Sequence, residues 1–134
     1  MELKCLTYTS WACPGLGAEQ VDAILASARI NNPVDGISGL LIFNGTAFMQ
    51  ILEGSASAVD DLARQLATDP RHSNMSIRDE REVTERRFPD WTMAYLEMKD
   101  EKFVGDAAVE RALRRDLPKP IRNLMRGLVH NVPR

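Results

Sequence analysis

The sequence is poor in the residues that build metal centres and disulfide frameworks. Its 134 residues include two cysteines and two histidines. Cys5 and Cys13 form no CxxC pair, and His72 and His130 lie far apart with no metal-ligand spacing around them. Because metal sites need three or four ligands at characteristic spacings, the sequence predicts neither a structural nor a catalytic metal.

Long apolar runs and a strong charge of either sign are missing as well. No stretch approaches the roughly 20 apolar residues of a transmembrane helix, and the start MELKCLTYTS lacks the features of a signal peptide. The 17 basic and 19 acidic residues give a net charge of -2, so nothing in the overall charge favours nucleic acid. We therefore expect a cytoplasmic, single-domain protein without a membrane or nucleic-acid partner.

The motifs of common enzyme classes are absent. Gly15-Leu16-Gly17 would need a glycine at position 20 for a dinucleotide fingerprint, and Gln20 stands there. Neither a phosphate-binding GxxxxGKS/T loop nor a GxSxG nucleophile elbow occurs. An acylphosphatase-type enzyme would need a phosphate-cradling loop after the first strand, and TSWACPGLGAE contains no arginine. We therefore expect no enzymatic activity.

The end of the chain is richer in basic residues than the rest. This excess fits a solvated helical face, or a docking surface for an acidic partner, and the sequence leaves both open. The basic residues are Arg111, Arg114, Arg115, Lys119, Arg122, Arg126 and Arg134, against Glu110 and Asp116.

Hydrophobic periodicity and turn residues divide the chain into short elements. Residues 3–9 have the composition of a strand, and a helical pattern begins at Ala18 and is expected to end at Pro33. Two apolar runs, 39–43 and 47–52, flank Asn44-Gly45, which predicts a tight hairpin turn. A second helix ends before Asp69-Pro70, and residues 75–85 and 91–98 look like two further strands.

The resulting order, β-α-β-β-α-β-β, predicts an α+β protein with a ferredoxin-like sheet that has one extra strand and carries its two helices on one face. Two tail helices are expected, over about 106–115 and from Pro118 onward. The second has an apolar stripe, which we expect to cover the other face of the sheet. The core then comprises residues 1–98 and the helical extension residues 99–134. The stripe consists of Ile121, Leu124, Met125 and Leu128.

Gln50 is the residue that most clearly breaks the local pattern. It lies in the otherwise apolar strand Ala47-Phe48-Met49-Gln50-Ile51-Leu52. Burying an unpaired amide costs about 1–3 kcal/mol, so Gln50 needs water or a specific partner. A structural hydrogen bond within the sheet and a bond to a ligand both satisfy this requirement.

Other polar and aromatic residues are individually unremarkable but together are compatible with one pocket. Tyr8 fits a strand, Asn31 and Asn32 fit a helix end, and Trp91 and Met93 fit a core strand. As a set, two amides, a phenol and a basic cluster suit a flat, polar, aromatic ring between two helices. The polar cluster past the second helix, within reach of a ligand's polar tail, consists of Asp69, Arg71 and His72.

Five sequence blocks, in order, resemble the BLUF family, the sensors of blue light using FAD. They extend from Leu3 to about Tyr95, and the central hairpin block is the most specific. The blocks are LTYTS (6–10), ARINN (28–32), ISGLLIFNGTAFMQILEG (37–54), DPRH (69–72) and RRFPDWTM (86–93).

The resemblance implies a role for each matching residue. It implies that Tyr8 donates an electron and a proton to the excited flavin, and that Gln50 bridges the tyrosine and the flavin. Trp91 and Met93 match a pair on the last core strand that changes position or bonding with light. The remaining flavin contacts that it implies are Ile24, Leu25, Asn31, Asn32, Phe48, Asp69, Arg71 and His72.

The resemblance also implies how such a protein works. FAD, or FMN or riboflavin in its place, would bind non-covalently, and light would leave Gln50 rotated or in another tautomer. The signal would leave through the last strand and the tail helices to a downstream protein or within a homo-oligomer. Trp11 is an unusual bulky residue that would compete as an electron donor if it lay near the flavin. A ligand-binding domain of the same fold without photochemistry is the alternative, favoured by loss of Tyr8 or Gln50, and both are present.

Overall fold

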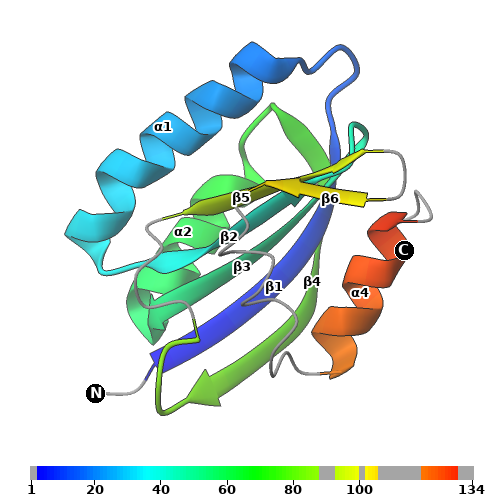
Figure 1. Cartoon of the computed structure of the whole chain (residues 1–134). Helices are drawn as coiled ribbons and strands as arrows, with labels where there is room; N and C mark the ends of the chain where they lie inside the picture. The colour runs from blue at the N-terminus through cyan, green and yellow to red at the C-terminus, as the bar shows by residue number, and fades with distance from the viewer. Residues whose placement is uncertain (1–2, 88–92, 100–101, 106–118, 130–134) are drawn as a thin grey trace.

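The computed structural model describes residues 3–87, 93–99, 102–105 and 119–129, and it contains six strands and three helices in this range (Figure 1). The strands and helices are β1 (Leu3–Ala12), α1 (Ala18–Asp35), β2 (Ser38–Phe43), β3 (Ala47–Ser55), α2 (Ala56–Ala67), β4 (His72–Val83), β5 (Ala94–Lys99), β6 (Lys102–Gly105) and α4 (Lys119–Val129).

The strands form one sheet in the order β4-β1-β3-β2-β5-β6. β1 lies between β3 and β4 and is antiparallel to both, whereas β5 runs parallel to β2. The predicted α+β, ferredoxin-like architecture is confirmed. β6 was not predicted, because it has only four residues and its length falls below what a hydrophobic pattern can reveal.

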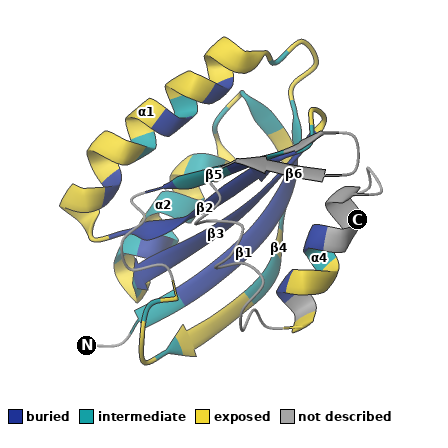
Figure 2. Cartoon of the chain, viewed as in Figure 1, coloured by how far each residue is buried: buried dark blue, intermediate teal, exposed yellow. Residues whose placement is uncertain are grey.

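Both faces of the sheet are buried, as Figure 2 shows for the central strands. Alternate residues of each strand point to opposite faces. On one face, Leu6 and Tyr8 of β1 pack with Val21 and Leu25 of α1 and with Val59 of α2. This double burial explains why β2 and β3 have nearly continuous apolar sequences instead of alternating ones.

Helix α4 covers the opposite face of the sheet (Figure 1). Its buried residues Ile121 and Met125 belong to the same cluster as Leu40 of β2 and Met49 and Ile51 of β3. The second tail helix therefore lies where the apolar stripe predicted. The other expected tail helix, at about 106–115, falls outside the described residues.

The turn between β2 and β3 differs in detail from a two-residue hairpin loop. Phe43 pairs with Phe48, and of the turn residues only Gly45 has a positive φ, of 96°. Asn44 contributes its side chain instead, since its Oδ1 accepts hydrogen bonds from the backbone N–H groups of Thr46 (3.0 Å) and Ala47 (2.7 Å). Asn44-Gly45 thus marked the turn correctly, although Asn acts there through an Asx-type contact.

The prediction that Pro33 ends the first helix was wrong. α1 continues to Asp35 and ends at Gly36, whose φ of 69° is left-handed. Gly36 N–H then bonds to Pro33 O, and Ile37 N–H bonds to Asn32 O at 2.8 Å. Proline lacks one backbone donor but still accepts bonds, so it is tolerated in this last turn and glycine makes the stop.

Arg86 ties the chain that leaves β4 to three other elements. Its guanidinium donates to Ser38 Oγ (2.9 Å), Glu53 O (3.2 Å) and Gly36 O (2.5 Å). Next to it, Arg87 N–H bonds to the carboxylate of Glu53, a residue with only 1% of its surface exposed. These contacts fix the point from which the chain proceeds toward β5.

The close pairing of β2 and β3 depends on Gly39. A Cβ added at this position would lie 2.0 Å from Ile51 O, a distance that no backbone tolerates. We predict that Gly39→Ala lowers the free energy of unfolding by about 1–3 kcal/mol or more, measured by urea denaturation. Gly17→Ala is the control, since its Cβ would meet only the flexible end of Gln20. Equal stability of the two variants would contradict this prediction.

Candidate functional site

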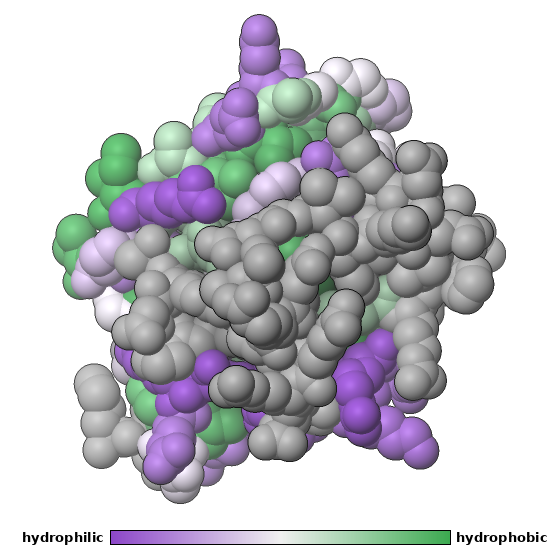
Figure 3. Space-filling view, in the orientation of Figure 1, coloured by the Kyte–Doolittle hydropathy of each residue, from purple (hydrophilic) through white to green (hydrophobic). Residues whose placement is uncertain are grey.

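A cavity of about 300 Å³ is bounded by α1, α2 and the middle of β3. α1 contributes residues at a helical spacing, and α2 and the turn after it form the other side. Figure 3 shows hydrophobic surface over α1 at the upper left. Val34, one of the lining residues on α1, is 85% exposed. The lining residues are Ile24, Ser27, Ala28, Asn31, Asn32, Val34, Asp35, Gln50, Leu62, Gln65, Leu66, Asp69 and Arg71.

Gln50 supplies the polar group that reaches the cavity from the sheet. It is 5% exposed, and its Oε1 accepts a hydrogen bond of 2.5 Å from Tyr8 Oη. The two residues face each other across the β1–β3 ladder, so the backbone itself brings them together. Of the alternatives that the sequence left open, the structure thus shows a hydrogen bond within the sheet, made by a residue that also lines a cavity.

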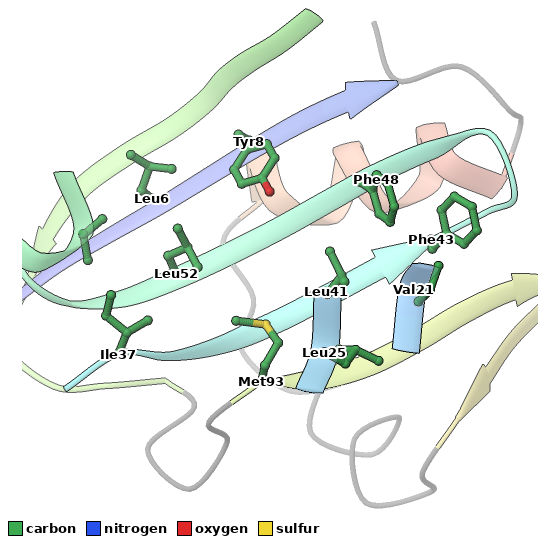
Figure 4. Packing of buried hydrophobic residues seen from close by; sticks show 11 residues of the cluster. Leu6, Tyr8, Val21, Leu25, Ile37, Leu41, Phe43, Phe48, Leu52 and Met93 are labelled. Atoms are coloured by element: carbon green, nitrogen blue, oxygen red, sulfur yellow. The ribbon is translucent and has the colours of Figure 1, made fainter. Parts of the chain in front are cut away.

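Tyr8 lies behind Gln50 and is closed off from solvent. It is 3% exposed, and its hydroxyl points toward β3 in Figure 4. Burial, together with the nearby negative charge of Asp69, raises the pKa of Tyr8 above the ordinary value for a phenol. Tyr8 is therefore a neutral hydrogen-bond donor at physiological pH.

Met93 contacts the nitrogen of the Gln50 amide. Gln50 Nε2 lies 3.4 Å from Met93 Sδ, and Met93 is 2% exposed at the start of β5. A thioether is a weak acceptor, and the amide nitrogen carries two hydrogens. Among the described residues, the thioether of Met93 is the side-chain acceptor that Nε2 meets. The nitrogen of this buried amide therefore has only a weak hydrogen-bond partner in that part of the chain.

An ion pair lies at the end of the cavity beyond α2. Arg71 Nε and one terminal nitrogen bond both oxygens of Asp69, at 2.7–3.1 Å. The Arg71 guanidinium holds the pKa of the Asp69 carboxyl below its usual range. The pair therefore remains charged and presents both signs to the cavity.

The predicted site residues do not all line this cavity. Ile24, Asn31, Asn32, Gln50, Asp69 and Arg71 do. Leu25 and Phe48 instead pack in the apolar cluster beneath it, with Tyr8 and Met93 (Figure 4). His72 lies beside Tyr8, with 6.0 Å between ring centroids, and Trp91 falls outside the described residues.

Trp11 lies away from the cavity, on the opposite face of the sheet from Tyr8. It packs against the cluster formed with α4, next to Ala47 on β3. Odd and even positions of β1 point to opposite sides, so the sheet separates Trp11 from Gln50. Trp11 is therefore not one of the residues that line the cavity.

Several lining residues were missed from the sequence, although a signal for them exists. On α1 the positions 24, 27, 28, 31, 34 and 35 recur at intervals of three or four, as one helical face does. On α2 the positions 62, 65 and 66 do the same. The missed residues are Ser27, Ala28, Val34, Asp35, Leu62, Gln65 and Leu66.

This chain matches the model of a known protein family over more than half of its length. The model of the BLUF family, described as sensors of blue light using FAD, matches residues 3–94. The chain belongs to the BLUF family. The resemblance of the five sequence blocks is thus confirmed, and the cofactor of the family is a flavin, FAD.

Curated relatives carry the BLUF domain as a small part of larger proteins. The chain is 33% identical over 92 residues to photoactivated adenylate cyclase subunit beta of Euglena gracilis, covering 68% of this chain and 11% of that protein. It is 32% identical over 73 residues to the blue light- and temperature-regulated antirepressor BluF of Escherichia coli (strain K12), covering 54% and 18%. The chain thus spans less than a fifth of the length of each of these two relatives.

Solved BLUF structures share the fold. The dark-state structure of BlrB, a BLUF protein, is 34% identical, covers 98% of each chain and has a TM-score of 0.75. A bacterial light-regulated adenylyl cyclase is 27% identical with a TM-score of 0.74, covering 96% of this chain and 34% of that one. A BLUF chain thus occurs both with a length like this one and within a longer enzyme.

The cavity suits the flavin of the BLUF family. Its volume is at the lower end of the range for small-molecule sites. Amide groups of Asn31, Asn32 and Gln50 offer donors and acceptors to the polar edge of a flat ring, and Ile24 and Leu66 offer apolar contact. Gln50 Nε2 has a thioether as its partner, which is a weak acceptor, and an acceptor on a flavin ring would be a stronger one.

The described helices include none with the length and apolar character needed to cross a bilayer. Across the same part of the chain, no three or more acidic, histidine or cysteine side chains come together as a metal site would require.

We predict that the two tyrosines resist ionisation in the folded BLUF protein. Burial raises the pKa of Tyr95 to about 12 and raises that of Tyr8 as well, whereas an unfolded tyrosine titrates near 10. Their stabilising contribution is complete below pH 10 and is lost as the pH rises through the folded values. Absorbance at 295 nm should therefore show no tyrosinate between pH 9 and 11, and stability should fall above about pH 10. A folded-state midpoint near 10 for both tyrosines would contradict this.

Proposed function

We propose that this chain senses blue light with a flavin held in the cavity between α1 and α2, and that Tyr8, Gln50 and Met93 register the light. The observation that carries this proposal is the buried contact series Tyr8 Oη–Gln50 Oε1 at 2.5 Å and Gln50 Nε2–Met93 Sδ at 3.4 Å. A glutamine with a purely structural role would not need to line a cavity. Gln50 bonds Tyr8 within the sheet and also lines the cavity.

The residues that would hold the flavin divide by chemistry. Asn31, Asn32 and Gln50 would bond the polar edge of the ring, and Ile24 and the apolar side of α2 would contact its face. Asp69 and Arg71 would lie toward the polar side, as a fixed ion pair. FMN and riboflavin present the same ring, so they remain alternatives to FAD at this site.

The flavin, when excited by blue light, supplies an oxidant strong enough to take an electron from a phenol. Tyr8 is placed for the response of the protein, because its proton already points along a short hydrogen bond to Gln50. A proton moving from Tyr8 Oη along this bond arrives at Gln50 Oε1. When the electron and a proton return to Tyr8, the amide of Gln50 is left rotated or in its other tautomer, with a different pattern of donors toward Met93 and the cavity.

The change at Gln50 has two routes out of the site. Met93 directly precedes β5, which pairs with β2 and β6. Met49 and Ile51, the neighbours of Gln50 on β3, point to the opposite face and pack with Ile121 and Met125 of α4. We propose that the packing of β5 and α4 shifts with light and alters a surface for a partner protein or a second copy of this chain.

This function is signalling instead of turnover. No bond of a substrate is made or broken in the proposed cycle, and the phenol and amide return to their starting composition. The relatives named as cyclases have long additional segments, since the match covers about a tenth of their length. The output of this chain would therefore depend on a partner or an assembly.

We predict a small red shift of the flavin absorption after a blue flash, which reverts in the dark. Tyr8→Phe removes the proton donor and Gln50→Leu removes the acceptor, so each variant should lose the shift while still binding flavin. Tyr95→Phe is the matched control, because it removes the other phenol, which is half-buried, but leaves Gln50 untouched. The measurement is the light-minus-dark absorption spectrum of purified protein.

A colourless protein that takes up no added flavin would overturn the proposal and favour a ligand-binding domain without photochemistry. Retention of the full shift in Tyr8→Phe would remove Tyr8 from the mechanism. Reduction of the bound flavin by NADH with turnover would instead indicate an enzyme.

The α4 route yields a separate prediction. If α4 shifts with light, limited proteolysis of the tail and light scattering should differ between lit and dark protein. Met125→Ala weakens the packing of α4 on β3. The tail of this variant in the dark should therefore be cleaved at a rate closer to that of the unmutated protein in the light. Identical cleavage and assembly in both states of the unmutated protein would exclude this route.

A further inference from the structure

Arg29 connects the wall of the cavity to the residue that contacts Gln50. Its Nε donates a hydrogen bond of 3.1 Å to the backbone oxygen of Met93, across 64 positions of sequence. Its neighbours on α1, Ala28, Asn31 and Asn32, line the cavity. One turn of α1 therefore carries both the wall of the site and a hold on Met93.

The position of Met93 needs such a hold. Its side chain contacts Gln50 only through a thioether, which is a weak hydrogen-bond acceptor. Its backbone lies immediately before Ala94, the first residue of β5 that pairs with β2. A charged donor from Arg29 is a stronger contact than the thioether and acts on the backbone, so it restricts where the sulfur can lie.

α1 itself is attached to the sheet by few buried residues. Val21, Leu25 and Asn32 are the buried ones in its 18 residues. Because the cavity separates much of its carboxyl-terminal half from α2, what fills the cavity affects where α1 lies. A displacement of α1 would reach Met93 directly through the Arg29 bond.

We propose that Arg29 is a positioning residue that sets the contact between Met93 and Gln50 and thereby couples the flavin cavity to β5. This inference rests on the proposed function, since it concerns the same photoresponse. Arg29 touches neither Gln50 nor Tyr8 in the described hydrogen bonds, so it acts through Met93. The coupling is reciprocal by linkage, because a bond that transmits a shift of α1 to Met93 also transmits a shift of Met93 to α1.

The test is the rate at which the lit spectrum returns to the dark one. In Arg29→Ala, Met93 loses a contact that restricts it, so we expect Gln50 to rearrange more easily. Dark recovery should then be faster by roughly fivefold, which is the lower end of usual coupling factors. Arg29→Lys keeps a cationic donor on a long stem and should recover within about twofold of the unmutated rate. An unchanged rate in Arg29→Ala would overturn the inference.

The matched control is Arg78→Ala. Arg78, like Arg29, is an arginine whose Nε bonds a distant element, at 2.8 Å from Thr9 Oγ1. Thr9 follows Tyr8 on β1 and thus points to the opposite face of the sheet. Arg78→Ala should leave the recovery rate unchanged even where it lowers stability, and an equal acceleration there would mean that general loosening explains the effect.

A double-mutant cycle with Met93→Ala distinguishes positioning from a direct effect. Met93→Ala removes the sulfur but keeps the backbone oxygen that Arg29 holds. If Arg29 acts through the Met93 side chain, adding Arg29→Ala to Met93→Ala should change the recovery rate no further. A full fivefold change in that background would contradict the proposed route.

The same experiments separate this inference from the proposed function. A red shift in the unmutated protein with unaltered kinetics in Arg29→Ala rejects the role of Arg29 and leaves the photosensor intact. Absence of any flavin or any shift in the unmutated protein rejects the proposed function itself. Loss of flavin by Arg29→Ala alone would assign Arg29 to binding and would also reject its role as a positioning residue.

Discussion

The hydrogen bond between Tyr8 and Gln50 is the constraint on which the rest of the site depends. The bond joins two polar side chains in the centre of a sheet that is covered on both faces. An unpaired amide or phenol in such a place would cost about 1–3 kcal/mol, so each residue makes the burial of the other tolerable. The bond satisfies the oxygen of Gln50 and leaves its nitrogen with a thioether, which is the weaker of its two partners.

The fold places this bond where it can be both protected and sensed. β1 and β3 are inner strands, so their ladder fixes Tyr8 opposite Gln50 without any help from loops. The side chains before and after Gln50 point to α4, and Met93 stands at the entry to β5. A rearrangement of one amide is thus adjacent to two elements on different sides of the sheet. Because packed cores prefer discrete arrangements, a small change there can be amplified.

Much of the fold followed from local patterns, and the failures have physical causes. The hairpin at Asn44-Gly45 and the apolar stripe of α4 were predictable because turn chemistry and helical spacing are local properties. The extension of α1 past Pro33 was not, because it depends on Gly36 adopting a left-handed conformation three residues later. For the site, Gln50 stood out as a polar residue in an apolar strand, but the placement of Trp11 behind the sheet required knowledge of which face is which.

The residues that sequence patterns overlook are those whose importance lies in a long-range contact. Arg29 has the composition and spacing of an ordinary helix surface, and only the approach of Met93, 64 positions later, gives it a role. Arg86 is similar, since its three hydrogen bonds join segments that are distant in sequence. Arg86 lies where the chain leaves β4, whereas Arg29 bonds the Met93 backbone just before β5. Arginine suits this task because its planar, permanently charged group can bond backbone oxygens at a distance from its own helix or loop. The bond from Arg29 is thus a charged contact to the Met93 backbone, whereas the Met93 side chain packs in the apolar cluster and meets Gln50 through a weak thioether acceptor.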